Sequence, residues 1–222
     1  MRHFVYFSNS AATSGKALSE GNLMKAGRMD IAIHVIIASF FLSHDIRKDV
    51  KLHLIFYGMP DPPKHIEIQV TDNLNISKKD VAGLIKKILY KYREGKKTEI
   101  FPGCFVEKKS FLKVIEELQS EGAKKSEIFG ATKSGAAPTR RTDEDFVGKE
   151  IFILDKKGED IRKIKTKDLE DAVFILGDQD GLPEKELRRL KKSCKMTSIG
   201  NKMYFASQVV AVLNNELDRR GL

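Results

Sequence analysis

The sequence is poor in cysteine and contains no tryptophan. Its two cysteines, Cys104 and Cys194, belong to no CxxC pair and to no cluster of cysteine and histidine. This pattern supports neither a disulfide framework nor a structural zinc site. We therefore expect a protein of the reducing cytoplasm that holds no metal.

Long apolar runs are also missing. The most apolar segment, residues 31–42, is interrupted by His34, and it is shorter than the about 20 residues that a membrane-spanning helix requires. The first residues, MRHFVYF, lack the apolar core of a signal peptide. We expect no association with a membrane.

The glycine motifs that bind phosphate groups are absent as well. The chain has no GxxxxGKS or GxxxxGKT sequence and no GxGxxG sequence. The glycine loop from Gly177 to Gly181 carries Asp178 and Asp180, whose charges would repel a phosphate. The sequence thus favours neither a P-loop enzyme nor a dinucleotide-binding enzyme.

Positive charge, in contrast, is abundant. The chain has 40 lysines and arginines against 31 aspartates and glutamates, a net charge of +9 and an isoelectric point near 9.4. Such a charge favours an anionic partner such as nucleic acid, although charge alone identifies none. The hydrophobic share of 41% suits a sizeable core, and no linker divides the chain. Residues 1–222 are expected to form a single domain.

The N-terminal half alternates strand and helix patterns. A strand is expected at residues 3–8, then a polar loop, then a helix from Asp30 to Leu42. His34 shares the apolar spacing of this helix and is expected to be a hydrogen-bonded core histidine. Further strands are expected at 51–57, 65–70 and 103–107, and further helices at 77–92 and 110–119. Residues 121–148 are poor in large apolar side chains and are interpreted as a flexible insertion.

The C-terminal part has the order strand, glycine loop, helix, strand, loop, helix. Strands are expected at 150–154, 172–176 and 196–200, a turn at 155–160, and an amphipathic helix at 203–217. The fold class is therefore α/β, with a mostly parallel sheet flanked by helices. Ligands of such sheets bind beyond the carboxyl ends of the strands, so residues 177–182 and 200–203 are the expected site.

Two loops at neighbouring strand ends can hold a neutral or cationic nucleoside through backbone N–H and C=O groups. Apolar side chains would wall its adenine ring: Leu154, Leu176, Ile199 and Met203. S-adenosylmethionine suits such a site, because its sulfonium is cationic and its methyl group needs only in-line positioning.

Two C-terminal stretches resemble the last two motifs of the SPOUT methyltransferases, which have an α/β trefoil knot: 174–182 (FILGDQDGL) and 197–210 (TSIGNKMYFASQVV). Three N-terminal stretches narrow the resemblance to the archaeal tRNA pseudouridine N1-methyltransferases, the TrmY family: 27–30 (GRMD), 40–50 (FFLSHDIRKDV) and 57–63 (YGMPDPP). That family acts on pseudouridine 54 in the T-loop of tRNA. The resemblance covers most of the chain and fails mainly across residues 121–148.

This resemblance implies a knot over about residues 150–222 that holds S-adenosylmethionine. The implied cofactor contacts are Leu154, Leu176, Gly177, Ser198, Ile199, Gly200, Asn201, Lys202, Met203 and Val209. Relatives carry cysteine where this chain has Val209, so a thiol is not required there. The family also implies a homodimer that packs across the last helix, and Asn214 and Asn215 are expected to face solvent or the partner subunit.

The implied reaction suggests catalytic residues. N1 of pseudouridine bears a proton that must be removed, and the developing anion must be stabilised. Asp30 is the candidate for proton removal, and Arg28 and Arg47 are candidates for stabilising or positioning the base or the RNA. The alternative is that Arg28 and Asp30 form only a structural ion pair.

Other functions stay open at this point. The nearest alternative is the same chemistry on small-subunit ribosomal RNA. A second is a catalytically silent RNA-binding relative that keeps the fold. A third is ribose 2′-O-methylation, as in other SPOUT branches, which would treat uridine and pseudouridine alike.

Overall fold

The computed structural model describes residues 1–18, 23–74, 76–130 and 149–222. The strands are β1 (Arg2–Ser8), β2 (Val50–Phe56), β3 (Lys64–Gln69), β4 (Thr98–Phe101), β5 (Cys104–Glu107), β6 (Ile151–Asp160), β7 (Val173–Gly177) and β8 (Lys195–Ser198). The helices are α1 (Met29–Phe40), α2 (Val81–Tyr90), α3 (Phe111–Gly130), α4 (Thr166–Leu169), α5 (Glu184–Leu190) and α6 (Ala206–Arg219). Short 3₁₀ turns are η1 (Gly15–Ala17) and η3 (Ile161–Lys163).

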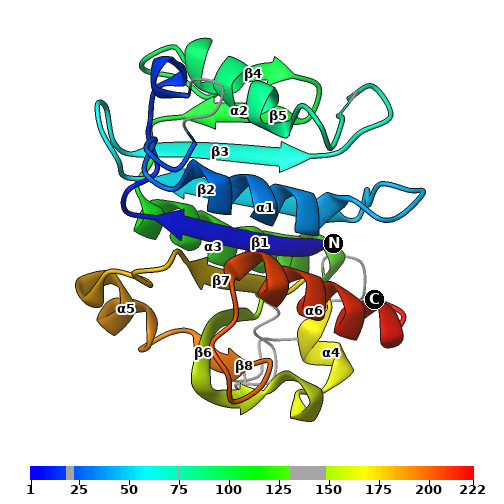
Figure 1. The fold of residues 1–222 in the computed structure, drawn as a ribbon. Helices are drawn as coiled ribbons and strands as arrows, with labels where there is room; N and C mark the ends of the chain where they lie inside the picture. The colour runs from blue at the N-terminus through cyan, green and yellow to red at the C-terminus, as the bar shows by residue number, and fades with distance from the viewer. Residues whose placement is uncertain (19–22, 75, 131–148) are drawn as a thin grey trace.

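The strands form one sheet in the order β4-β5-β3-β2-β1-β7-β6-β8. β1 pairs in parallel with β2 and β7, and β6 pairs in parallel with β7 and β8. Beyond β2, the strands β3, β5 and β4 are antiparallel. The expected α/β fold is confirmed, and its parallel part brings the carboxyl ends of β2, β1, β7, β6 and β8 to one edge, toward which the β1 arrow points in Figure 1.

Each face of the sheet has its own core, because successive strand residues point to opposite sides. Phe4 and Tyr6 belong to the core under α1, α2 and α6, whereas Val5 and Phe7 belong to the core under α3. Figure 1 shows α1 and α6 in front of the sheet and α3 behind it. Burying each of these aromatic side chains stabilises the fold by about 1.5–3 kcal/mol. Within the described residues, no helix combines the length and the apolar character needed to cross a membrane.

A buried arginine ties α6 to β1. Arg2 donates hydrogen bonds to Asn214 Oδ1 at 3.0 Å and to Asp218 Oδ1 at 2.6 Å. The Asn214 amide nitrogen donates to the carbonyl of Ala38 in α1 at 3.1 Å. Asn214 is therefore buried, and the expectation that it faces solvent or a partner is wrong, because its amide is satisfied inside. Asn215 is exposed, as expected.

The expected helix at 30–42 is present as α1, but the side of the helix that carries His34 faces solvent and not the core. His34 is exposed, so its prediction as a core histidine is wrong. Buried residues occur on nearly every side of this helix. Hydrophobic spacing therefore could not decide which face met the sheet.

Several element boundaries also differ from the prediction. The sequence does not predict β4, a four-residue edge strand. α3 continues to Gly130, so residues 121–130 are helical rather than flexible, while 131–148 lie outside the described residues. β6 extends to Asp160, and its pairing register with β8 shifts between Leu154 and Glu159, where only a turn was expected.

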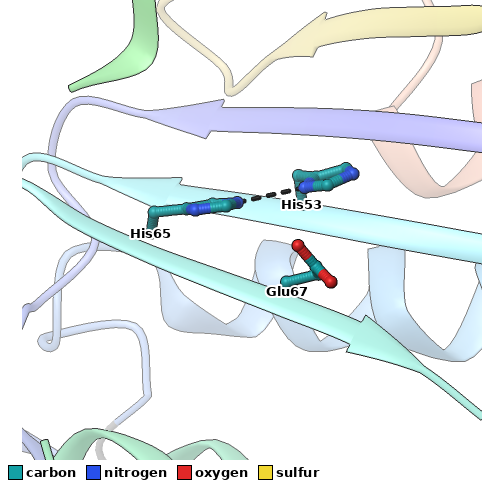
Figure 2. Close-up of side chains that lie close together, drawn as sticks. All are labelled: His53, His65 and Glu67. Carbon is teal, nitrogen blue, oxygen red and sulfur yellow. Dashed lines mark hydrogen bonds between the residues drawn. The ribbon is translucent and has the colours of Figure 1, made fainter. Parts of the chain in front are cut away.

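A row of buried histidines crosses β1, β2 and β3 on the side of α3. His53 Nδ1 lies 3.0 Å from His65 Nε2, and His65 Nδ1 lies 3.0 Å from Glu107 Oε1 (Figure 2). The His53 and His65 rings are nearly parallel, with centroids 5.3 Å apart. The two facing nitrogens thus lie along the line between the rings, which is the geometry of a hydrogen bond.

Glu67 lies beside this pair, and its carboxylate and the two imidazoles have atoms within 4.8 Å of one another (Figure 2). A shared metal would need both ring nitrogens to converge on it at an angle, whereas here they point at each other. Glu67 instead pairs with Lys97 at 2.9 Å and Lys51 at 3.6 Å. These contacts favour a hydrogen-bonded row over a metal centre.

Burial disfavours the charged form of two histidines of this row, His53 and His3. It lowers the pKa of His53 well below 6.5, an effect to which the nearby His65 and His3 add, and it also lowers the pKa of His3. Acid therefore protonates the unfolded chain more readily than the folded one. The resulting stability is present above the unfolded pKa of about 6.5 and is lost as the pH falls below it.

Lowering the pH from 7.5 to 5.5 is expected to reduce the free energy of unfolding by about 1.4 kcal/mol for each histidine that stays neutral when folded. Urea denaturation at the two pH values measures this. In His53→Gln, the loss of unfolding free energy between the two pH values should be smaller by about 1.4 kcal/mol. In His34→Gln, which changes an exposed histidine, the loss should equal that of wild type. Equal pH dependence in wild type and His53→Gln would contradict the account.

Candidate active site at the carboxyl edge of the sheet

The structure brings the predicted cofactor residues of three strands to one edge. β6 pairs Ile153 with Ile175 of β7 and Leu154 with Thr197 of β8. Because parallel strands end on the same side, Leu176 and Ser198 lie near neighbouring strand ends. Leu154 lies beside them, where the register of β6 with β8 shifts. The loops that follow β7 and β8 continue from this edge.

These residues divide into an apolar wall and an exposed loop. Leu176 is buried, and Leu154, Ile199 and Val209 are partly buried against the core under α1 and α6. Asn201, Lys202 and Met203 are exposed. Met203 is 80% exposed and does not pack with the apolar wall.

Space for a ligand remains over both loops. A Cβ added to Gly181 or Gly200 would meet no atom within 4 Å. In contrast, a Cβ added to Gly177 would lie 2.5 Å from the carbonyl carbon of Gly181, so the β7 loop folds tightly on itself. Open space beside backbone groups and an apolar wall fits the nucleoside part of S-adenosylmethionine.

One carboxylate joins the loop after β1 to the loop after β7. Asp178 Oδ2 accepts hydrogen bonds from Ser8 Oγ at 2.8 Å and from the Asn9 backbone N–H at 3.0 Å. Its Oδ1 accepts from the backbone N–H of Asp180 at 3.0 Å. Asp178 therefore positions two loops. Sequence reasoning missed this contact, because Ser8 and Asp178 become neighbours only through the pairing of β1 with β7.

Arg28 and Asp30 lie at the start of α1, at the same edge. Arg28 donates from Nε and from Nη2 to the two carboxylate oxygens of Asp30, at 3.2 Å each. Arg28 adopts the left-handed conformation, with φ of 61°. The structural ion pair considered as the alternative is thus present, yet the side chains are 39% and 25% exposed and accessible to a substrate.

Tyr6, which the sequence analysis did not single out, lies near this pair. Its side chain is fully buried, and its hydroxyl has no hydrogen-bond partner among the described residues. Burial raises the pKa of Tyr6, and the carboxylates of Asp178 and Asp30 raise it further. The phenol therefore stays protonated, as a hydrogen-bond donor next to the Arg28–Asp30 pair.

Arg47 lies far from Arg28 and Asp30 in the structure. Its backbone N–H donates to the carbonyl of Phe40 at 2.7 Å, at the end of α1. The 12 residues of α1 separate this end from Arg28 by about 18 Å. Arg47 donates to Asp218 Oδ1 at 2.8 Å, which ties it to α6 near the opposite edge of the sheet. Within one chain it therefore does not join the candidate active site.

The fold is similar to that of a solved protein that binds S-adenosylhomocysteine. A crystal structure of Nep1 from Archaeoglobus fulgidus bound to S-adenosylhomocysteine is similar at a TM-score of 0.57 and 13% identity, over 99% of each chain. At this identity the similarity shows the fold alone.

A family model described as "Putative SAM-dependent RNA methyltransferase" matches residues 1–135 and 141–222. The chain belongs to this family. It is 32% identical to a protein of Methanococcoides burtonii, over 99% of this chain and 96% of that protein. It is also 32% identical to a protein of Methanocella arvoryzae, over 99% and 100% of the two chains. Both relatives are named tRNA (pseudouridine(54)-N(1))-methyltransferase.

Asp178→Ala is expected to weaken binding of S-adenosylhomocysteine by about 10-fold or more, because it removes charge-assisted hydrogen bonds that hold two loops. Isothermal titration calorimetry measures this. Asp72→Ala is the matched control, since the Asp72 side chain is 83% exposed, pairs with Lys48 and lies outside both loops. Unchanged affinity in Asp178→Ala would show that this carboxylate does not organise the cofactor loops.

Proposed function

We propose that this protein transfers a methyl group from S-adenosylmethionine to N1 of pseudouridine 54 in the T-loop of tRNA. The observation that carries the proposal is the full-length similarity to relatives that bear this name. The net charge of +9 supports an RNA substrate. The Arg28–Asp30 pair at the same edge as the cofactor loops supports a chemical step that needs both a base and a cation.

The cofactor, when bound, supplies an electrophilic methyl group. Its contacts would come from the apolar wall and the two loops: Leu154, Leu176, Gly177, Ser198, Ile199, Gly200, Asn201, Lys202, Met203 and Val209. The C-terminal segment from about residue 150 is expected to thread as a knot, in line with the family. Ser8 and Asn9, through Asp178, would hold the β7 loop against β1 while the RNA binds.

Asp30 is the proposed acceptor of the N1 proton. As the proton leaves, negative charge develops on the base, and the Arg28 guanidinium is placed to stabilise it. For this, Arg28 shifts part of its hydrogen bonding from Asp30 to the base.

A homodimer is the proposed assembly, in the cytoplasm. Large apolar side chains lie exposed just before α6 and on it: Met203 (80%), Tyr204 (46%), Phe205 (71%) and Val212 (38%). Because a monomer would leave these side chains in water, they support a contact with a second copy.

Asp30→Asn is expected to lower the rate of methyl transfer by about 100-fold, because the amide cannot accept the N1 proton. The assay uses labelled S-adenosylmethionine and paired T-loop RNAs that carry pseudouridine or uridine at position 54. Asp72→Asn, in an exposed loop, is the control and should retain wild-type activity. Methylation of the uridine RNA by the wild type would refute the N1 mechanism and favour 2′-O-methylation. Failure of the wild type to methylate either RNA, with no cofactor binding, would favour a catalytically silent module.

An experiment in cells distinguishes tRNA from small-subunit ribosomal RNA as the substrate. Mass spectrometry of tRNA and small-subunit rRNA from a deletion strain should show that N1-methylpseudouridine disappears from tRNA. Loss of the mark from rRNA alone would replace the tRNA proposal with the ribosomal one.

Phe205→Asp is expected to shift the protein from dimer to monomer, because it places a charge within the exposed apolar group. Sedimentation velocity measures the change. Met24→Asp is the matched control, since Met24 is 65% exposed but lies away from α6 in sequence. If the wild-type protein sediments as a monomer, the proposal of a homodimer is wrong.

A further inference from the structure

A cavity of about 480 Å³ opens beside the Arg28–Asp30 pair, beyond the carboxyl ends of β1 and β2. Its walls come from three segments that are distant in sequence, at residues 9–12, 25–27 and 57–59, and from Ala17. Its volume falls in the range of about 300–1,000 Å³ that is usual for ligand sites. The two glycine-bearing stretches at 27–30 and 57–63 thus meet around one space.

The walls of this cavity are held by backbone hydrogen bonds. The Ala12 N–H donates to the carbonyl of Ala26 at 3.1 Å, and the Gly58 N–H donates to the carbonyl of Ala11 at 3.0 Å. A Cβ at Gly27 would lie 1.7 Å from the Ser10 carbonyl oxygen, so only glycine permits this approach. The cavity is therefore preformed.

The lining combines apolar, aromatic and cationic groups. The half-buried Tyr57 is fixed because its hydroxyl accepts the Phe111 N–H at 3.0 Å. Met59 is 74% exposed at the cavity, and Lys25 is an exposed cation on its wall. No carboxylate belongs to its described lining. A mainly apolar lining with one lysine suits a nucleobase and its phosphate.

The position of the cavity relative to the cofactor loops limits which nucleotide fits. Asn9 lines the cavity and also donates its N–H to Asp178 of the β7 loop. Gly27, which also lines the cavity and packs against Ser10, directly precedes Arg28. The strands β7, β1 and β2 are neighbours, so the cavity lies roughly 5–10 Å along the sheet from β7. It is thus next to the place where the target base reacts, on the side away from β6 and β8.

We propose that this cavity binds an unpaired nucleotide adjoining the target in the RNA strand. Its base packs against Met59 and the apolar walls, and its phosphate pairs with Lys25. Enzymes that modify a base must extract it from its stack, and seating a neighbour outside the helix holds the target in place. The inference rests on the proposed function and adds to it a second nucleotide site.

The test fills the cavity. Ala17→Trp adds an indole at its wall, and Met24→Trp adds the same group to an exposed residue that does not line it. Fluorescence anisotropy measures binding of a T-loop stem-loop with pseudouridine at position 54. Ala17→Trp is expected to bind about 10-fold more weakly than wild type, and Met24→Trp as tightly as wild type. Circular dichroism confirms that both variants fold.

Abasic RNAs identify the nucleotide. One abasic RNA should lack the base that the cavity binds, which is one of the two that adjoin the target. Wild type should bind that RNA more weakly than intact RNA, and no more tightly than Ala17→Trp binds it. Equal binding of intact RNA by wild type and Ala17→Trp would overturn the proposal. The proposal would also be overturned if wild type and Ala17→Trp still differed in affinity for every abasic RNA. The same holds if this difference disappeared only when the target base itself was removed.

Methylation of the same RNA separates this inference from the proposed function. If wild type methylates pseudouridine but Ala17→Trp binds normally, the cavity assignment fails alone. If wild type shows the expected binding pattern without methylation, the proposed function fails and the nucleotide site stands. Absence of any RNA binding by wild type would overturn both.

Discussion

The parallel pairing of β1 with both β2 and β7 is the constraint on which the rest of the structure depends. It joins the N-terminal half, with α1 and β2, to the C-terminal half, with β6, β7 and β8. Because parallel strands end on the same side, the loops of both halves meet at one edge. A shift of one residue in the pairing register of β1 would turn Tyr6 and Ser8 to the other face of the sheet. It would separate them from α1 and Asp178.

The two halves contribute different parts of the candidate site. The C-terminal half offers backbone groups, open space and an apolar wall, which suit a nucleoside. The N-terminal half offers the charged pair of Arg28 and Asp30 and the adjoining cavity. Asp178 connects the halves, since it accepts hydrogen bonds from Ser8 and Asn9. The loop after β1 and the loop after β7 are therefore linked through one carboxylate.

Sequence patterns predicted most elements of this fold because their periodicities are strong. The β1, β2 and β7 runs are apolar, and α2 and α6 have clear apolar faces. The pattern failed where the periodicity was ambiguous. α1 is apolar on nearly all sides, so His34 was assigned to the wrong face. β4 is short and partly exposed, so no alternation marks it.

By itself, the sequence determined the α/β class, the two loops at strand ends and the resemblance that led to a methyltransferase family, because these depend on local patterns and short motifs. The tertiary structure decided which residues meet. It joined Asp178 to Ser8, placed an unpartnered Tyr6 hydroxyl near Asp30, and moved Arg47 to the far end of α1. Contacts between distant segments follow from strand order and register, and no local pattern of residues encodes these.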